Sequence, residues 1–181
     1  SMLEQAVQYL TSNDVTNFDA VHGTAETLPL EDHSLHDLTT FNAIHHFDFR
    51  RFIENALQAV DPEAAKIFIY TRTPSQNAGS IWGQYFPGFA ERETRLYELD
   101  DTEDMIESID AVRLDTTISF KYGRRATLDD LIARVRARHY STFSLDDDSE
   151  LEDATEVFQG NVAGAFDDTS DIEWSDEDML L

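Results

Sequence analysis

Residues 48–71 carry the pattern that most limits how this chain can fold: an amphipathic helix followed by a buried strand. Apolar residues recur at spacings of three and four over 49–60, which predicts a helix with one apolar face, and Asp48 is placed to cap its start. Pro62 ends this helix, and Lys66–Thr71 then forms an apolar run typical of a strand in a parallel sheet. A helix that leads into a buried strand predicts an α/β domain.

The same alternation extends along the rest of the chain. Strands are expected at 18–21, 35–41, 112–122 and 172–174, and helices at 2–11, 102–109, 128–137 and 149–158. Thr127 is expected to cap the helix that follows it. Because helices separate most of these strands, we expect one domain over residues 1–181 with a mostly parallel sheet.

The segment 73–97 interrupts the alternation. It mixes polar residues and glycines with the aromatic residues Trp82, Tyr85, Phe86 and Phe89. Long insertions in compact domains often bind ligands, so one interpretation is a lid or a substrate-side insertion. The other interpretation is a hydrophobic cluster that packs under a long loop.

Net charge excludes some classes of partner. The chain has 37 acidic and 13 basic residues, for a net charge of −24. Such a charge repels phosphate backbones and anionic membranes, so we expect neither nucleic acid nor membrane as a partner. Self-repulsion of this size is used by halophilic proteins, which predicts a surface adapted to high salt. An ordinary acidic protein with acidic loops is the alternative.

Cysteine and long apolar stretches are both missing from the sequence. With no cysteine there is no disulfide, no thiolate nucleophile and no Cys-based zinc site. The longest apolar runs are only a few residues, and the N-terminus shows no secretory signal. We therefore expect a cytoplasmic protein without a metal centre.

Three short motifs follow one another between residues 23 and 47. They read GTAETLPL at 23–30, SLHDL at 34–38 and FNAIHHF at 41–47. This succession resembles the G-D-A-E-x-L-P-F, S-F-D-x-V and x-x-A-x-H-H run of class I S-adenosylmethionine (SAM)-dependent methyltransferases of the ubiquinone/menaquinone-methyltransferase-like superfamily (methyltransferase type 11). Each motif alone is weak, but their order and spacing together are specific.

The resemblance implies a Rossmann-like methyltransferase sheet and SAM as cofactor. Ligands in open parallel sheets lie beyond the carboxyl ends of the strands, where these motifs would share one rim. The residues that the resemblance places around SAM are Thr24, Ala25 and Glu26 beside the adenine, and Phe41, Asn42 and Ala43 under the ribose and methionine portion. Thr24 stands where the family often has an aspartate.

The N-terminal part departs from the family pattern. Class I methyltransferases open with a strand, a glycine-rich turn, a helix and a second strand that ends in an acid for the ribose. Here Gly23 is the first glycine, and no G-x-G occurs. We therefore expect an N-terminally truncated sheet with the first two strands absent, and impaired SAM binding. The strand at 18–21 would lose its neighbour, which predicts a homodimer or a partner chain that carries the missing strands.

Several side chains are candidates for the chemistry of the site. His45 or His46 is the candidate general base, with a metal site or structural histidines as the alternatives. Arg72 follows the central strand and is a candidate to meet an anionic group of the substrate, or else a surface salt bridge. Trp82, Tyr85 and Tyr140 are the other candidates on the substrate side.

The leading hypothesis is a SAM-dependent methyltransferase domain that acts on a small molecule. Methyl transfer from a sulfonium depends mostly on alignment and desolvation, so a base would be optional. Two alternatives remain open: a catalytically inactive, methyltransferase-like interaction subunit, and a half-enzyme completed by another chain.

Overall fold

The chain forms two compact units, which are described separately here. The structure is a computed structural model that describes residues 2–27 and 29–181. Ser1 and Leu28, the latter within the first motif, lie outside the described residues. The first unit comprises residues up to 38 together with 47–67, and the second comprises 39–46 and 68–181.

Within its described residues, the first unit contains two helices, and both agree with the predictions. Helix α1 spans Met2–Ser12, and helix α2 spans Phe49–Ala59. As expected, the Asp48 side chain caps α2 by accepting the N–H of Arg51 at 3.1 Å. The apolar face of α2 is buried at Phe49, Phe52, Ile53, Ala56 and Ala59. Burial contributes roughly 1.5–3 kcal/mol for each large apolar side chain, which is why the three-and-four spacing decides this helix.

The strand predicted at 18–21 is wrong. These residues belong to no assigned strand, and Val21 is 49% exposed. A strand needs a hydrogen-bonded neighbour at about 4.8 Å, and none of the strands that the structure describes pairs with this segment. The homodimer hypothesis relied on an unpaired strand here, so it loses that basis.

Four strands form one sheet in the order β1-β2-β4-β3. Their bounds are Asp37–Phe41 for β1, Lys66–Thr71 for β2, Ile118–Ala126 for β3 and Ile172–Leu180 for β4. The strand predicted at Lys66–Thr71 is confirmed, whereas β3 begins six residues later than expected and β4 is longer. The α/β fold class is confirmed.

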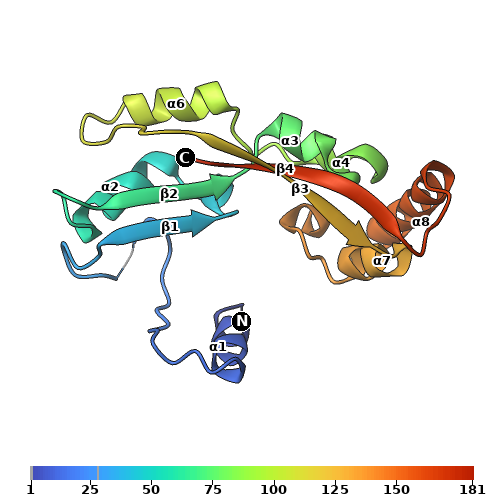
Figure 1. Ribbon diagram of the computed structural model, residues 1–181, viewed down its shortest axis with the longest axis horizontal. Helices are drawn as coiled ribbons and strands as arrows, with labels where there is room; N and C mark the ends of the chain where they lie inside the picture. Colours follow the sequence, from blue (N-terminus) through green and yellow to red (C-terminus); the bar gives the residue numbers. More distant parts are fainter. Residues whose placement is uncertain (1, 28) are drawn as a thin grey trace. The chain divides into compact units, whose positions relative to one another are not determined.

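The expectation of a mostly parallel sheet needs correction. Figure 1 shows β1 and β2 pointing the same way, but β4 is antiparallel to both of its neighbours, β2 and β3. The N–H of Leu128, at the start of the excursion that follows β3, donates to the Thr169 carbonyl near its end at 2.9 Å. The chain therefore returns at the end of the sheet where it left, and β4 must run back along β3.

Helices of the second unit follow β2 and β3. Those after β2 are α3 (Pro74–Gly79), α4 (Ile81–Tyr85), α5 (Phe89–Arg92) and α6 (Leu99–Glu107); those after β3 are α7 (Leu128–Arg136) and α8 (Asp148–Ala165). Thr127 caps α7 as predicted, and Asp130 completes a reciprocal capping box. Helix α8 has its own capping box, between Asp147 and Glu150, and is longer than the predicted 149–158.

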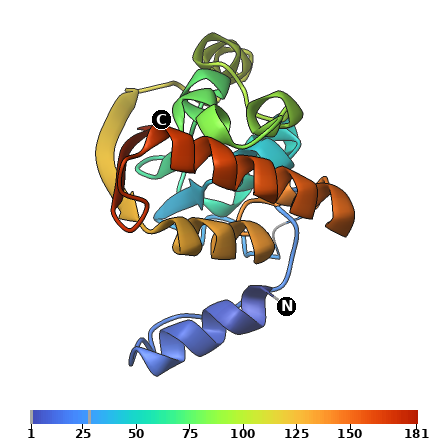
Figure 2. The same cartoon turned by 90° about the vertical axis from the view of Figure 1, so that its right-hand side faces the viewer.

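An aromatic core holds the helices of the second unit together. The rings of Trp82 and Phe158 lie 5.2 Å apart, and those of Phe86 and Phe143 lie 5.0 Å apart. Helices α7 and α8, side by side in Figure 2, contribute Leu131, Val135 and other buried residues to the same cluster. The segment 73–97 therefore folds into short helices whose large side chains are core, and its role as a lid stays a prediction.

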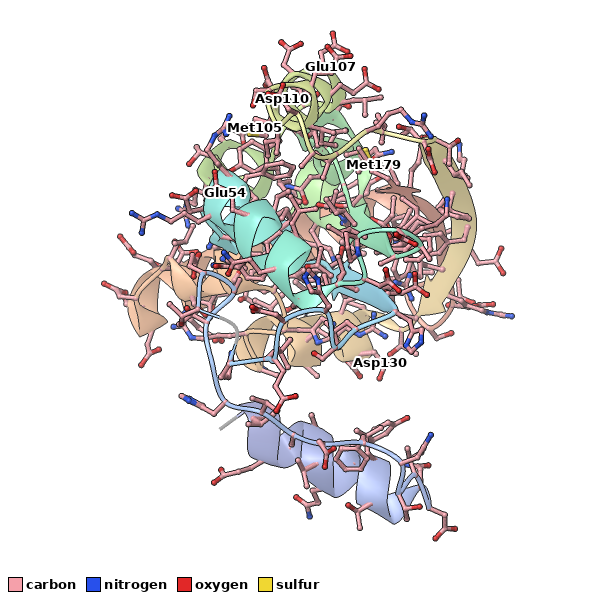
Figure 3. All side chains as sticks on the ribbon, turned by 90° about the vertical axis from the view of Figure 1, so that its left-hand side faces the viewer. Glu54, Met105, Glu107, Asp110, Asp130 and Met179 are labelled. Atoms are coloured by element: carbon pink, nitrogen blue, oxygen red, sulfur yellow. The ribbon has the colours of Figure 1, made fainter. Side chains whose placement is uncertain are left out.

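Acidic side chains cover the outer surfaces of the helices. In Figure 3, Glu107 and Asp110 lie at the outer end of α6, and Asp130 lies on α7; all three are exposed. Carboxylates in water keep their hydration, so at these positions the acidic composition is accommodated without burying charge.

Candidate functional site

The two histidines lie together on one short turn. A 3-10 turn, Ile44–His46, follows β1 and is anchored by the buried side chain of Ile44. The chain enters this turn through Asn42, which has a left-handed φ of 49° and whose N–H donates to the Tyr70 carbonyl at 2.8 Å. Asparagine tolerates that conformation better than most residues. The imidazole rings of His45 and His46 lie with their centroids 4.1 Å apart.

An arginine and a buried glutamate fix the position of this turn. The Arg95 guanidinium lies 3.3 Å from His46 Nδ1, and its Nε donates to Glu93 Oε1 at 2.7 Å. Because a guanidinium can only donate, Nδ1 of His46 accepts and the ring proton lies on Nε2. Thr142 donates to Glu93 Oε2 at 2.6 Å, and Arg95 donates to Ser141 Oγ at 3.1 Å. We call His45, His46, Glu93 and Arg95 the histidine cluster.

His45 is held in its neutral form, and one of its ring nitrogens makes no hydrogen bond within the described residues. Burial, assisted by the neighbouring His46, lowers the pKa of His45 to about 4, although the Glu93 carboxylate acts in the other direction. Its Nδ1 is buried and has no hydrogen-bond partner within the described chain. A neutral imidazole with an unengaged nitrogen can accept or relay a proton. Burial and Arg95 also lower the pKa of His46.

The carboxyl group of Glu93 remains charged although its side chain is buried. Burial by itself raises the pKa of Glu93, but the hydrogen bonds from Arg95 and Thr142 outweigh it and the pKa is lowered. The hydrogen bond to Glu93 in turn raises the pKa of Arg95. The pair is therefore a fixed ion pair that supports the histidine turn.

A second polar group surrounds Asp178, which is buried in β4. Arg72, directly after β2, places Nη2 2.8 Å from Asp178 Oδ1. The hydroxyls of Tyr70 and Tyr122 both donate to Asp178 Oδ2, the former at 2.8 Å. Burial and Asp178 raise the pKa of both tyrosines. Arg72 is thus a buried ion-pair partner rather than a surface salt bridge, and its charge is already matched.

The segment predicted to lie beside the adenine is engaged within the first unit. The hydroxyls of Thr24 and Thr27 are 2.8 Å apart, and the Glu26 carboxylate accepts the N–H of Asp48 at 3.1 Å. That backbone N–H lowers the pKa of Glu26. Asn55, on α2, donates to the Glu26 carbonyl. One oxygen of Glu26 is thereby used to hold the turn against the start of α2.

Phe41, Asn42 and Ala43 lie in the second unit, at the carboxyl end of β1. The Phe41 ring stacks on Tyr70 with centroids 4.1 Å apart and planes 3° apart, yet its side chain is 65% exposed. A flat, exposed ring at a strand end can carry an apolar part of a ligand. The residues therefore fit SAM in part: they offer a surface for it, but the sequence contains no glycine-rich turn for its methionine portion.

The remaining substrate-side candidates lie in different surroundings. Trp82 is enclosed in the core at 1% exposure, so the hydrophobic-cluster interpretation describes it. Tyr140 packs against that core, with its ring centroid 5.9 Å from Trp82. Tyr85 is half-buried, packs against the same core and lines a hollow together with residues of β3 and β4.

Sequence reasoning missed Glu93, Arg95, Tyr122 and Asp178. The only local signal was a Glu and an Arg two residues apart, directly after the aromatic segment. Among the described residues, no three His, Asp or Glu side chains are grouped so that they could hold a metal ion. In the same part of the chain, no helix is long and apolar enough to cross a bilayer.

Comparison with models of protein families gives no match, and no curated protein matches the sequence. Solved structures do match. A candidate methyltransferase from Bacillus halodurans has a TM-score of 0.59 at 17% identity, over 98% of this chain and 76% of its own. A candidate methyltransferase of an antibiotic biosynthesis pathway from Anabaena variabilis has a TM-score of 0.58 at 16% identity, over 94% and 77%.

The YcgJ protein from Bacillus subtilis also matches, with a TM-score of 0.52 at 18% identity, over 99% of this chain and 76% of its own. Identities this low concern the fold alone. The chain therefore has the class I SAM-type methyltransferase fold that the three motifs implied.

Proposed function

We propose that this chain belongs to a SAM-dependent methyltransferase that acts on a small molecule and that it carries the acceptor side of the site. The fold match to candidate methyltransferases over nearly the whole chain is the observation that carries this proposal. The histidine cluster supports it, because it combines a neutral imidazole with a buried ion pair at the end of a sheet strand.

His45 is the proposed general base. SAM, when bound, supplies a methyl group on a positively charged sulfur. A lone pair of the acceptor would bond to the methyl carbon while the carbon–sulfur bond breaks and the sulfur leaves as a neutral thioether. His45 would take the acceptor proton, because its lowered pKa keeps the ring neutral and able to accept. Arg95 and Glu93 act as positioning residues that hold the adjacent His46.

We propose further that the 181 residues alone bind SAM weakly. The sequence has no G-x-G turn, and one carboxylate oxygen of Glu26 already accepts a hydrogen bond from the N–H of Asp48. Losing the two ribose hydrogen bonds to a charged partner costs about 1.5–3 kcal/mol each. Since about 1.4 kcal/mol is a factor of ten, a micromolar site would weaken by about 10²- to 10⁴-fold, toward the millimolar range. A half-enzyme completed by a glycine-rich segment from elsewhere, and an inactive interaction subunit, remain the alternatives.

Calorimetric titration of SAM into the 181-residue chain tests this proposal. We expect no saturation below about 1 mM. Saturable micromolar binding would show that a complete cofactor site exists in these residues. His45→Gln is the matched control, because His45 is proposed to contact the methyl acceptor and its replacement should leave the affinity for SAM unchanged. Absence of SAM binding up to about 20 mM would favour the inactive interaction subunit instead.

A further inference from the structure

A hollow of about 840 Å³ opens in the second unit, and neither the histidine cluster nor the Asp178 group contributes to it. Residues of α3, α4, β3 and β4 line it, together with the start of α6 and Phe166. In Figure 1, α3 and α4 lie beside β4, where this hollow forms. A volume of this size is in the range of small-molecule sites. We call it the α3–α4 hollow.

Three aromatic residues give the hollow an apolar wall: Tyr85, Phe166 and Trp174. The rings of Tyr85 and Phe166 meet edge to face, with centroids 5.6 Å apart. The Trp174 indole N–H donates to Asp176 Oδ1 at 3.0 Å, which fixes the side chain. All three pack against the aromatic core, so this wall is held in place before any ligand arrives.

Three carboxylates also line the hollow: Glu98, Glu173 and Glu177. Glu177 accepts only a 3.4 Å hydrogen bond from Gln76, and Glu173 lies 3.8 Å from Arg125 with both side chains mostly exposed. The Glu98 carboxylate has no ion-pair or hydrogen-bond partner within the described chain. These charges are therefore weakly compensated.

Lys121 is the one basic side chain among the lining residues that the structure describes. It lies directly opposite Glu177 in the pairing of β3 with β4. Residues opposite each other in an antiparallel pair have Cβ atoms about 4.5–5.5 Å apart, so Lys121 offsets the charge of Glu177. The charges of Glu98 and Glu173 are not offset by Lys121, so they give the hollow a negative potential.

We propose that the α3–α4 hollow binds a small organic cation, an ammonium group that carries an aryl or alkyl body. The aromatic wall attracts a cation through its ring faces and accepts the apolar body, while the carboxylates neutralise the charge. An anionic ligand would be repelled by the carboxylates. A neutral ligand would displace water from them without replacing its hydrogen bonds. This site is independent of SAM and of the proposed methyl transfer.

The test compares three probes of one shape at constant ionic strength: phenethylammonium, 2-phenylethanol and 3-phenylpropanoate. We expect saturable calorimetric binding of phenethylammonium at about 1 mM or tighter, and at least about tenfold weaker binding of the alcohol and the anion. Trp174 lines the hollow whereas Trp82 is buried in the core, so binding of phenethylammonium should change the fluorescence of Trp174. In Trp174→Phe this fluorescence change should vanish, while the heat of binding remains measurable by calorimetry. Equal binding of the alcohol, or no saturation, would overturn the proposal.

Charge variants give effects of opposite sign. Glu98→Gln should weaken phenethylammonium binding by about three- to fivefold, and Lys121→Gln should tighten it by a similar factor. Glu107→Gln is the matched control, because it removes the same charge at the exposed outer end of α6 (Figure 3). Thermal melts confirm that each variant is folded. If Glu107→Gln weakens binding as much as Glu98→Gln, only a diffuse attraction to an acidic surface exists, and the site is refuted.

Discussion

The aromatic core around Trp82 and the polar group around Asp178 are both buried in the second unit, but different forces hold them. The core consists of rings and aliphatic side chains whose energy comes from volume and area removed from water. The Asp178 group consists of one carboxylate, one guanidinium and two phenol hydroxyls. Its members are held to one another by an ion pair and two hydrogen bonds, although Asp178 Oδ1 has the ion pair alone.

The difference concerns function as much as stability. Burying an ion pair seldom gains stability over an apolar replacement of equal volume, because desolvation offsets the attraction. The Arg72–Asp178 pair is therefore expected to contribute little net stability to the sheet. Contacts such as that between Trp82 and Phe158 are expected to contribute much more to the packing of the helices. Arg72 also contributes to the electrostatic environment of His45, which connects the two polar groups. Through this charge, the Asp178 group affects the pKa of His45, the proposed general base.

The largest expected effect is on the core. Phe158→Ala removes a fully buried ring that contacts Trp82 and Phe86, and should lower the free energy of unfolding by about 3–5 kcal/mol. Urea unfolding followed by tryptophan fluorescence measures it. Its neighbour Val157 is 52% exposed on the same helix, so Val157→Ala should change stability by no more than about 0.5 kcal/mol. Equal effects of the two variants would mean that this core is not the one that holds the unit.

Breaking the Asp178 group should have the next largest effect. Asp178→Ala leaves the buried Arg72 guanidinium without its counter-charge and two tyrosine hydroxyls without an acceptor, and should cost about 3 kcal/mol in urea unfolding. The double variant Arg72→Met/Asp178→Leu should recover most of that loss, because it removes both charges. If the losses of the two single variants instead add in the double variant, Arg72 and Asp178 are not energetically coupled as an ion pair.

The histidine turn should make stability depend on pH. The pKa of His45 is about 4 in the folded chain against about 6.5 when unfolded, so below pH 6.5 the unfolded state binds a proton that the folded state does not. Its contribution is therefore complete above about pH 6.5 and is lost as the pH falls toward 4. Between pH 7 and pH 5 the wild type should lose on the order of 1 kcal/mol more than His45→Gln. Parallel curves for the two proteins would exclude a buried neutral His45.

Salt should have the smallest effect and should separate the surface from the interior. Raising salt from about 0.1 M to 1 M shortens the reach of repulsion from about 10 Å to about 3 Å, so the acidic surface should gain stability. We expect a melting temperature several degrees higher in the wild type, with the same gain in Arg72→Met/Asp178→Leu, because buried pairs are screened little. A flat curve would count against adaptation to high salt, and a smaller gain in the double variant would place the salt effect in the Asp178 group.

Local patterns were enough to predict much of the fold. The apolar spacing before Pro62 and the run Lys66–Thr71 each match an observed element, as do the caps at Asp48 and Thr127. These are interactions within a few residues, whose physics is contained in the sequence window itself. The strand at 18–21 failed for the complementary reason, since a strand exists only through a neighbour that the window does not contain.

In the candidate site too, features set by local sequence could be predicted and features set by tertiary contacts could not. The adjacency of His45 and His46, and their place after a strand, could be predicted because both are properties of the local sequence. The Arg72–Asp178 pair could not, because its members come from β2 and β4, and only the antiparallel return of β4 brings them to 2.8 Å. The sequence by itself determined the elements, the acidic surface and the histidine turn. Only the tertiary structure decided which charges are buried together, because desolvation and ion pairing depend on the three-dimensional surroundings of each group.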